Sequence, residues 1–220
     1  MTAKNYSKTV KKPSDPVVVL VHGAGAGLDS GFLVAAKAGF EARGLTVIGV
    51  EFDYMIQARA AGKRRPPPAV AGLVVELREV VEALGKPVVI VGKSMGGRIA
   101  SMLAASDGMP ANVLAVSVLG YPFHPTSKPH QLRVQHFEQI QVPLMIFQGS
   151  RDPFGRAAEI QPLFAASSWP GTIELHWLES GDHDFQPTRR SGKSREDLLD
   201  EALDATVTWM QQRLAERLGR

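Results

Sequence analysis

The segment VVIVGKSMGGR, residues 88–98, joins an apolar run to a serine that has a glycine two positions away on each side. Its centre, GKSMG, fits the pattern G-x-S-x-G, in which a strand turns sharply into a helix and holds the serine in a strained backbone conformation. Such a turn presents the Ser94 hydroxyl at the end of the sheet and leaves the N–H of Met95 free at the start of a helix. The segment therefore predicts a nucleophile together with a donor for a negatively charged oxygen.

The same segment also resembles the end of a phosphate-binding loop, because Gly92, Lys93 and Ser94 match its last three positions. That motif requires a glycine at position 87, where this sequence has Pro87. Residues 88–91 are all β-branched, which favours a buried strand over a phosphate-cradling loop. The nucleotide interpretation is therefore rejected here, while a serine without any chemistry stays open on this motif alone.

The composition predicts one globular domain, because 220 residues with 44% hydrophobic and 21% charged side chains can bury a sizeable core. We expect that domain over residues 17–220, after an N-terminal tail, residues 1–16, that lacks the apolar core of a signal peptide. Cysteine is absent, which excludes a disulfide scaffold and a thiolate metal site and fits a reducing compartment. The expected location is cytoplasmic.

Charge and hydropathy argue against two classes of partner. The formal net charge is +3, but the charges are scattered and form no aromatic-basic face, so nucleic acid is not expected as a partner. The longest uncharged stretch, residues 109–127, is interrupted by proline and polar residues. It predicts a buried strand with its following loop rather than a membrane span, so no membrane partner is expected.

Short apolar runs alternate with longer amphipathic segments along the chain. Besides the run that leads into Ser94, the expected strands are residues 17–21, 46–52, 113–119, 144–148 and 172–178. The expected helices are residues 30–43, residues 69–84, the stretch after Ser94, and a long C-terminal helix that opens with Ser194 and Asp197 as a capping box and is apolar at Leu199, Leu203, Met210 and Leu214.

This alternation predicts an α/β fold, with about six strands in a mostly parallel sheet and helices on both faces. Right-handed crossovers place every strand-to-helix loop along the carboxyl edge of such a sheet. Functional side chains are therefore expected at that edge.

Three residues of a nucleophilic triad follow three different expected strands. Ser94 follows the apolar run that begins at residue 88. Asp152 lies in GSRDPFG after residues 144–148, and His183 lies in GDHDFQP after residues 172–178. The order serine, acid, histidine is that of α/β-hydrolases. Alone, Asp152 suits a turn and His183 an exposed loop, but their joint placement predicts a triad.

Two other acids and four other histidines compete for the same roles. Asp184 adjoins His183, but neighbours in an extended turn point apart, so Asp152 is preferred and Asp182 is the weaker fallback. His176 lies in the middle of an expected strand. His124, His130 and His136 come too early in the chain to be the last member of the triad.

The loop HGAGAG, residues 22–27, is expected to supply the second donor of an oxyanion hole with Met95. Its small residues let backbone N–H groups approach a substrate oxygen. We expect Ala24 to be that donor, with Gly25 as the near alternative, and we assign His22 a structural hydrogen-bonding role.

The same loop mimics the dinucleotide fingerprint G-x-G-x-x-G, and Glu51 or Asp53 near the end of the next strand adds to the likeness. Leu28 occupies the third glycine position. A Rossmann protein therefore stays open only as a remote alternative.

Residues near the expected edge could line a substrate pocket, although core packing or pairing with acids explains them as well. The basic residues Lys93 and Arg98, with residues 63–65, could favour an acidic ester. The preferred explanation is that Lys93 and Arg98 pair with nearby acids and that residues 63–65 form a solvated loop. The possible pocket residues are Tyr121, Phe123, His124, His136, Lys93 and Arg98.

The motifs HGAGAG, GKSMGGR, GYPFHP, GSRDPFG and GDHDFQP together span most of the chain. With these motifs the chain resembles a small, lidless, dienelactone-hydrolase-like α/β-hydrolase. It is similar to the bacterial family whose animal relatives include a testis-expressed protein and a subunit of the non-specific-lethal chromatin complex. The resemblance implies a parallel sheet with a nucleophile elbow and no separate lid domain. It also implies interaction roles, because the animal members are known largely as interaction proteins.

The expected function is a serine hydrolase that cleaves a small soluble ester, or a related acyl compound, through an acyl-enzyme, without a metal or an organic cofactor. The alternative is a binding protein that keeps the hydrolase shape, because a fold alone does not give a function.

Overall fold

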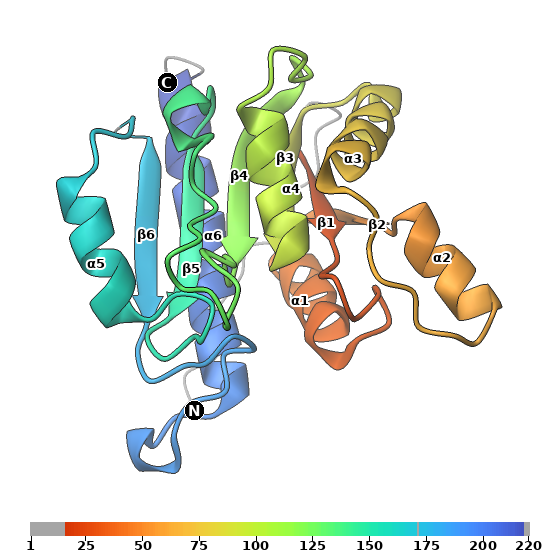
Figure 1. Cartoon of the computed structure of the whole chain (residues 1–220). Coiled ribbons are helices and arrows are strands. Elements are labelled where there is room, and N and C mark those ends of the chain that lie inside the picture. The colour runs from red at the N-terminus through yellow and green to blue at the C-terminus, as the bar shows by residue number, and fades with distance from the viewer. Residues whose placement is uncertain (1–15, 171, 218–220) are drawn as a thin grey trace.

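The computed structural model describes residues 16–170 and 172–217, which form a six-stranded sheet with helices on both faces (Figure 1). The strands are β1 (Val17–Val21), β2 (Thr46–Val50), β3 (Val88–Lys93), β4 (Val113–Leu119), β5 (Leu144–Gly149) and β6 (Ile173–Leu178). The helices are α1 (Gly31–Ala42), α2 (Asp53–Ala60), α3 (Val70–Leu84), α4 (Met95–Ala104), α5 (Ala157–Ala166) and α6 (Arg195–Arg217), with short 3-10 turns η1 (Phe137–Gln139) and η2 (Arg189–Ser191).

Every strand pairs in parallel with its neighbours, in the order β2-β1-β3-β4-β5-β6. The chain places β2 beside β1 on one side and then returns to place β3 beside β1 on the other side. The carboxyl ends of β1 and β3 therefore form a switch point, which is where open α/β sheets bind ligands. The order differs from the 3-2-1-4-5-6 order of the dinucleotide-binding Rossmann sheet.

The four inner strands, β1, β3, β4 and β5, are buried on both faces, whereas the edge strands β2 and β6 stay partly exposed. Successive side chains of a strand point to opposite sides of the sheet, so each inner strand contributes to two cores. Val19 and Val21 pack with α3 and α4, whereas Val18 and Leu20 pack with α1 and α6. Two apolar cores therefore sandwich the sheet and hold its carboxyl edge rigid. The expected α/β-hydrolase architecture is confirmed.

The capping box expected at the start of α6 is present. Ser194 N–H donates to Asp197 Oδ2 at 2.7 Å, and Asp197 N–H donates to Ser194 Oγ at 3.1 Å. Leu199, Leu203 and Met210 are buried, as the helical spacing predicts.

The structure differs from the sequence expectations in three places. The strand expected over residues 46–52 ends at Val50, because Phe52 is the N-cap of α2. Helices α2 and α5 were not expected, since α2 is short and largely polar and α5 contains Pro162.

The connection between β4 and β5 contains no helix other than η1, and its Phe137 is fully buried, so this segment forms no separate lid. No helix in the described part of the chain is long and apolar enough to span a bilayer. The expected tail lies, except for Pro16, outside the described residues, and the domain boundary at residue 17 stays a prediction.

Candidate active site

Ser94 sits between β3 and α4 in a conformation that non-glycine residues rarely adopt, with φ 52° and ψ −116°. The flanking glycines make the turn possible. A Cβ at Gly92 would collide with the backbone of Gly97, and a Cβ at Gly96 would lie 2.5 Å from the carbonyl oxygen of His22. The G-x-S-x-G spacing thus builds a strained turn that raises the Ser94 side chain above the carboxyl edge of the sheet.

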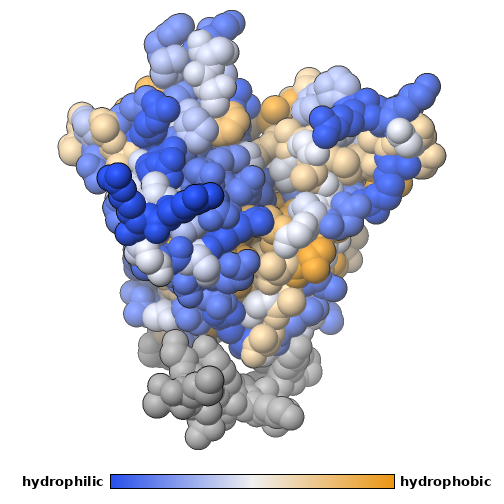
Figure 2. All heavy atoms as spheres, turned by 90° about the horizontal axis from the view of Figure 1, so that it is seen from below, coloured by the Kyte–Doolittle hydropathy of each residue, from blue (hydrophilic) through white to orange (hydrophobic). Residues whose placement is uncertain are grey.

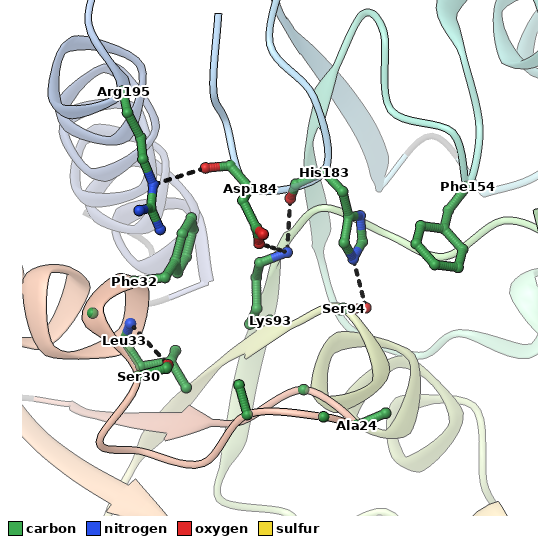
Figure 3. A pocket seen from close by; sticks show the side chains of 14 residues that line it. Ala24, Ser30, Phe32, Leu33, Lys93, Ser94, Phe154, His183, Asp184 and Arg195 are labelled. Atoms are coloured by element: carbon green, nitrogen blue, oxygen red, sulfur yellow. Dashed lines mark hydrogen bonds and ion pairs between the residues drawn. The ribbon is translucent and has the colours of Figure 1, made fainter.

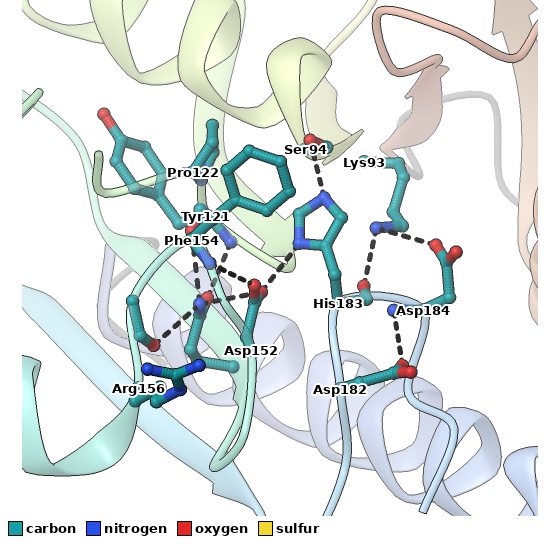
Figure 4. Close-up of polar contacts among 12 residues, drawn as sticks. Lys93, Ser94, Tyr121, Pro122, Asp152, Phe154, Arg156, Asp182, His183 and Asp184 are labelled. Atoms are coloured by element: carbon teal, nitrogen blue, oxygen red, sulfur yellow. Dashed lines mark hydrogen bonds and ion pairs between the residues drawn. The ribbon is translucent and has the colours of Figure 1, made fainter. Parts of the chain in front are cut away.

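The side chains of Ser94, His183 and Asp152 form one hydrogen-bonded chain at that edge (Figure 4). His183 Nε2 lies 2.8 Å from Ser94 Oγ, and His183 Nδ1 lies 2.7 Å from Asp152 Oδ2. An ionised carboxylate can only accept hydrogen bonds, so Nδ1–H donates to Asp152. Nε2 is then free to accept a hydrogen bond from the Ser94 hydroxyl. Residues from three strand ends are brought into the arrangement that a proton transfer from Ser94 requires.

Asp152 is completely buried, and its carboxylate has three donors. Besides His183, Gln148 Nε2 donates to Oδ2 at 2.9 Å and the N–H of Phe154 donates to Oδ1 at 2.8 Å. Gln148 is itself fixed, because its Oε1 accepts from the N–H of Tyr121 at 2.7 Å. The buried charge is therefore satisfied, and the carboxylate cannot turn away from the imidazole.

The alternative acids do not face the imidazole nitrogens in this arrangement. Asp182 Oδ1 accepts from the N–H groups of Asp184 and Gln186, each at 2.9 Å, and so closes the turn that carries His183. Asp184 Oδ1 lies 3.2 Å from Lys93 Nζ. The two carboxylates shape the turn of residues 182–186, called here the histidine loop, and Asp152 is the acid that faces the His183 imidazole.

Lys93, the residue before Ser94, connects the end of β3 to the histidine loop through its side chain (Figure 3). Its Nζ donates to the carbonyl oxygen of His183 at 2.7 Å, pairs with Asp184, and lies 5.1 Å from the centre of the Phe32 ring. Burial lowers the pKa of Lys93 below its ordinary value, although Asp184 favours the charged form. Burial alone would raise the pKa of Asp184, but the charge and hydrogen bond of Lys93, together with smaller contributions that include the charge of Arg195, lower that pKa.

The loop that precedes α1 is held by Tyr54 and His22. The Tyr54 hydroxyl lies 3.0 Å from the carbonyl oxygen of Ala24, and His22 Nδ1 lies 2.6 Å from the carbonyl oxygen of Gly23. His22 Nε2 accepts from the N–H of Phe52 at 3.1 Å, and burial lowers the pKa of His22. His22 is thus a neutral bridge between two loops, which is the structural role expected for it.

The same contacts orient the N–H groups of this loop. In a trans peptide the C=O and N–H bonds point in opposite directions, so the N–H groups of Ala24 and Gly25 face away from the side chains that hold the carbonyls of Gly23 and Ala24. Within the described residues, neither N–H donates to a protein acceptor, nor does that of Met95. The loop and the start of α4 therefore offer the free donors that an oxyanion requires, with Ala24 and Gly25 both available.

A cavity of about 410 Å³ opens beside the serine. Phe154 covers one side of the imidazole, with ring centres 4.5 Å apart, and Arg195 lies over Phe32 at 5.4 Å. Arg195 Nε donates to the carbonyl oxygen of Asp184 at 3.1 Å. The cavity wall is formed by small and apolar residues with a few polar ones: Gly23, Ala24, Gly25, Ala26, Ser30, Gly31, Phe32, Leu33, Lys93, Ser94, Phe154, His183, Asp184 and Arg195.

Most of the expected pocket residues lie outside the lining of this cavity, so the prediction that they line it is wrong. Tyr121 and Phe123 are fully buried, Tyr121 packs against both Phe123 and Phe137 in the core, and His124 is 2% exposed. His136 bonds to Ser101 at 2.8 Å, and burial lowers its pKa to about 4. These side chains turn inward because the segment after β4 packs against the sheet and α4 instead of opening over the serine.

Of the two basic residues expected beside the elbow, only Lys93 lines the cavity, and its charge is paired with Asp184. Arg98 lies one turn into α4, outside the cavity lining. Its Nε is buried and lacks a hydrogen-bond partner among the described residues.

Sequence patterns did not identify Gln148, Tyr54 or Phe154 as parts of the site. Gln148 carried a signal, because it is the one strongly polar side chain in the strand LMIFQG. Tyr54 and Phe154 lie in loops or short helices whose position depends on packing across the sheet, so no local pattern could place them.

The chain matches the family model described as "Alpha/beta hydrolase domain" over residues 14–211. Est1E from Butyrivibrio proteoclasticus is similar in structure, with a TM-score of 0.65 at 13% identity over 93% of this chain and 90% of that chain. An α/β serine hydrolase homologue from Coxiella burnetii gives a TM-score of 0.63 at 16% identity, over 88% of this chain and 86% of that one. The esterase domain of a Rhodothermus marinus protein gives a TM-score of 0.62 at 14% identity, over 90% of this chain and 87% of that chain. The likenesses show the fold, and the family match shows that this chain belongs to the α/β-hydrolase family.

Proposed function

We propose that this protein is a serine hydrolase that cleaves a small soluble ester by acyl-enzyme chemistry. Ser94 is the nucleophile, His183 the general base and acid, and Asp152 the group that orients the imidazole. The observation that carries the proposal is the unbroken pair of hydrogen bonds, 2.8 Å from Ser94 Oγ to Nε2 and 2.7 Å from Nδ1 to Asp152 Oδ2.

In the first half-reaction, Ser94 Oγ forms a bond to the carbonyl carbon of the ester while its proton passes to His183 Nε2. The bond between that carbon and the leaving oxygen then breaks, and the leaving oxygen takes the proton from Nε2. In the second half-reaction a water molecule attacks the acyl-serine, gives its proton to Nε2, and Ser94 Oγ recovers that proton as the acid departs. Asp152 stays ionised and stabilises the imidazolium in both halves.

The negative oxygen that forms at each attack is assigned to the N–H of Met95 and the N–H of Ala24, with Gly25 as the alternative to Ala24. Support comes from the free N–H groups of the loop, whose carbonyls are held by Tyr54 and His22. One such donor contributes about a hundredfold to a thousandfold in comparable enzymes.

A small substrate is favoured by the size of the cavity, about 410 Å³, and by the short β4–β5 connection. Among the similar structures are an esterase domain from Rhodothermus marinus and Est1E with bound ferulic acid, which supports an ester as the substrate class.

Hydrolysis of p-nitrophenyl acetate by the Ser94→Ala variant tests the proposal. The expected result is a loss of kcat by about 10⁴-fold or more, with unchanged circular dichroism. Ser127→Ala, which changes an exposed loop serine in the same way, should keep the wild-type rate. Equal turnover by Ser94→Ala would remove Ser94 from the reaction, and a wild-type protein without turnover of any small ester would favour the interaction protein instead.

A further inference from the structure

A second cavity of about 480 Å³ lies next to the active-site cavity and is not used by the proposed reaction. Its walls come from α2, from the loop before α1 and from the segment after α2. Ala24 and Gly25 line both cavities. The full lining is Ala24, Gly25, Asp29, Met55, Ala58, Arg59, Gly62, Lys63, Arg64 and Arg65.

Three of the cations in this lining have no carboxylate partner in the described part of the chain: Lys63, Arg64 and Arg65, called here the basic segment. Arg59 differs, because it pairs with Glu51 and lies 3.6 Å from Asp29. Asp29 is the only acid in the lining, and Arg59 already engages it. The second cavity therefore carries uncompensated positive charge on one side.

The basic segment is held in place by its own contacts. Gly62 adopts a positive φ of 59°, and the N–H of Lys63 donates to the carbonyl oxygen of Ala58 at 3.1 Å. Arg65 Nη1 donates to Gln57 Oε1 at 2.8 Å. Residues 66–68 are three consecutive prolines, which restrict the backbone that follows. These contacts fix the backbone at Lys63 and the guanidinium of Arg65, and all three cations of the segment line the second cavity. In Figure 2, which faces the carboxyl edge of the sheet, hydrophilic side chains project on the side where α2 lies in Figure 1.

The boundary between the two cavities is low. It consists of Ala24 and Gly25, which carry no side chain beyond a methyl group. A Cβ built at Gly25 would meet nothing within 4 Å, so the space above the boundary is open. A molecule whose ester carbonyl lies at Ser94 can therefore extend over the boundary to the basic segment.

We propose that the second cavity is a substrate subsite for a phosphate-bearing group carried at a distance from the scissile bond. The inference rests on the proposed hydrolase function and names its substrate class, an ester or thioester with a phosphorylated end. Adjacent guanidinium groups match phosphate oxygens through paired hydrogen bonds, and Lys63 adds a further charge. Met55 and Ala58 offer an apolar surface to the part of the substrate between ester and phosphate.

Binding of inorganic pyrophosphate, measured by calorimetry at low ionic strength, tests the subsite without requiring catalysis. The variant Lys63→Gln/Arg64→Gln/Arg65→Gln should bind at least tenfold more weakly than the wild type. The control Lys37→Gln/Lys86→Gln/Arg190→Gln has the same net charge, changes exposed cations that line neither cavity, and should bind like the wild type. Equal loss in both triple variants would show a general charge effect and would overturn the subsite.

A pair of thioesters tests whether the phosphate belongs to the substrate. Acetyl-coenzyme A and S-acetylpantetheine share the acetyl group and the thiol arm, but only the first carries phosphates. The released thiol can be read with a thiol reagent without background, because the protein has no cysteine. The wild type should show a kcat/KM at least tenfold higher for acetyl-coenzyme A, and the preference should decrease with added salt.

In the basic-segment variant this ratio should fall to about twofold or less, whereas the charge-matched control should keep it. An unchanged ratio, together with lost pyrophosphate binding, would mean that the cavity binds a free phosphate compound and would overturn the substrate assignment. Failure of the proposed function has a different signature. In that case Ser94→Ala would hydrolyse as fast as the wild type, while the binding difference between the two triple variants would remain.

Discussion

Lys93 Nζ donates a 2.7 Å hydrogen bond to the main-chain oxygen of His183, so the residue before Ser94 holds the loop that carries the imidazole. The distance between Ser94 Oγ and His183 Nε2 is thus fixed by two links, one through the side chains and one through Lys93. Because Lys93 is 8% exposed, this second link is shielded from water.

Lys93→Met should lower kcat for p-nitrophenyl acetate about tenfold, because the histidine loop loses its bond to the nucleophile turn while the apolar packing on Phe32 is kept. Asp184→Asn should lower kcat less than threefold, since Lys93 can still donate to the carbonyl of His183. Steady-state kinetics on folded variants will compare them. An equal loss in both would mean that the ion pair, not the bond to the carbonyl, holds the loop.

The Lys93–Asp184 pair should make stability depend on pH. The pKa of Asp184 is lowered from 3.8 in the folded protein, so the unfolded chain binds its proton first as the pH falls. The contribution of Asp184 is therefore complete well above pH 4 and disappears as the pH falls through its folded-state pKa. Denaturant unfolding of wild type and Asp184→Asn should show a difference in free energy at pH 6 that vanishes near pH 2. A difference that grows on acidification would contradict the pairing.

Gln148→Leu should lower both stability and turnover. The buried N–H of Tyr121 would lose its acceptor and Asp152 would lose one donor, at a cost of about 2–3 kcal/mol in the free energy of unfolding. A less fixed carboxylate should reduce kcat about tenfold. Gln161→Leu, the same change on the exposed side of α5, should alter neither quantity. If Gln148→Leu has the same midpoint of denaturant unfolding as the wild type, the hydrogen bonds of Gln148 contribute nothing to the free energy of unfolding.

Gly96→Ala should destabilise the fold by about 3 kcal/mol or more, because the new Cβ would lie 2.5 Å from the carbonyl oxygen of His22 and 2.7 Å from that of Val21. Gly72→Ala is the matched control. Its Cβ meets nothing within 4 Å in α3, so the substitution should stabilise by about 0.5 kcal/mol through helix propensity. Thermal unfolding will compare the two, and a wild-type melting temperature for Gly96→Ala would show that the turn does not require close contact.

The sheet was predictable because most strands are largely apolar runs, although β6, IELHWL, alternates apolar and polar residues. The order Ser94, Asp152, His183 follows from the strand ends. The small residues of the loop 22–27 identify it as a candidate source of oxyanion donors, which stays a prediction. The contacts that hold these groups were not predictable, since the bonds of Gln148 to Asp152 and of Lys93 to His183 join elements far apart in the chain. The inward position of Tyr121 also depends on packing against Phe137, and that of Phe123 on packing against Phe164, which no local spacing reveals.

The most direct measurement of the central claim is covalent labelling by a fluorophosphonate, followed by mass spectrometry of the modified peptide. The account predicts one adduct on Ser94 in the wild type, none in Ser94→Ala, and at least a hundredfold slower labelling in His183→Gln, because the serine then lacks its base. A wild-type protein that stays unlabelled, or an adduct on another serine, would contradict it.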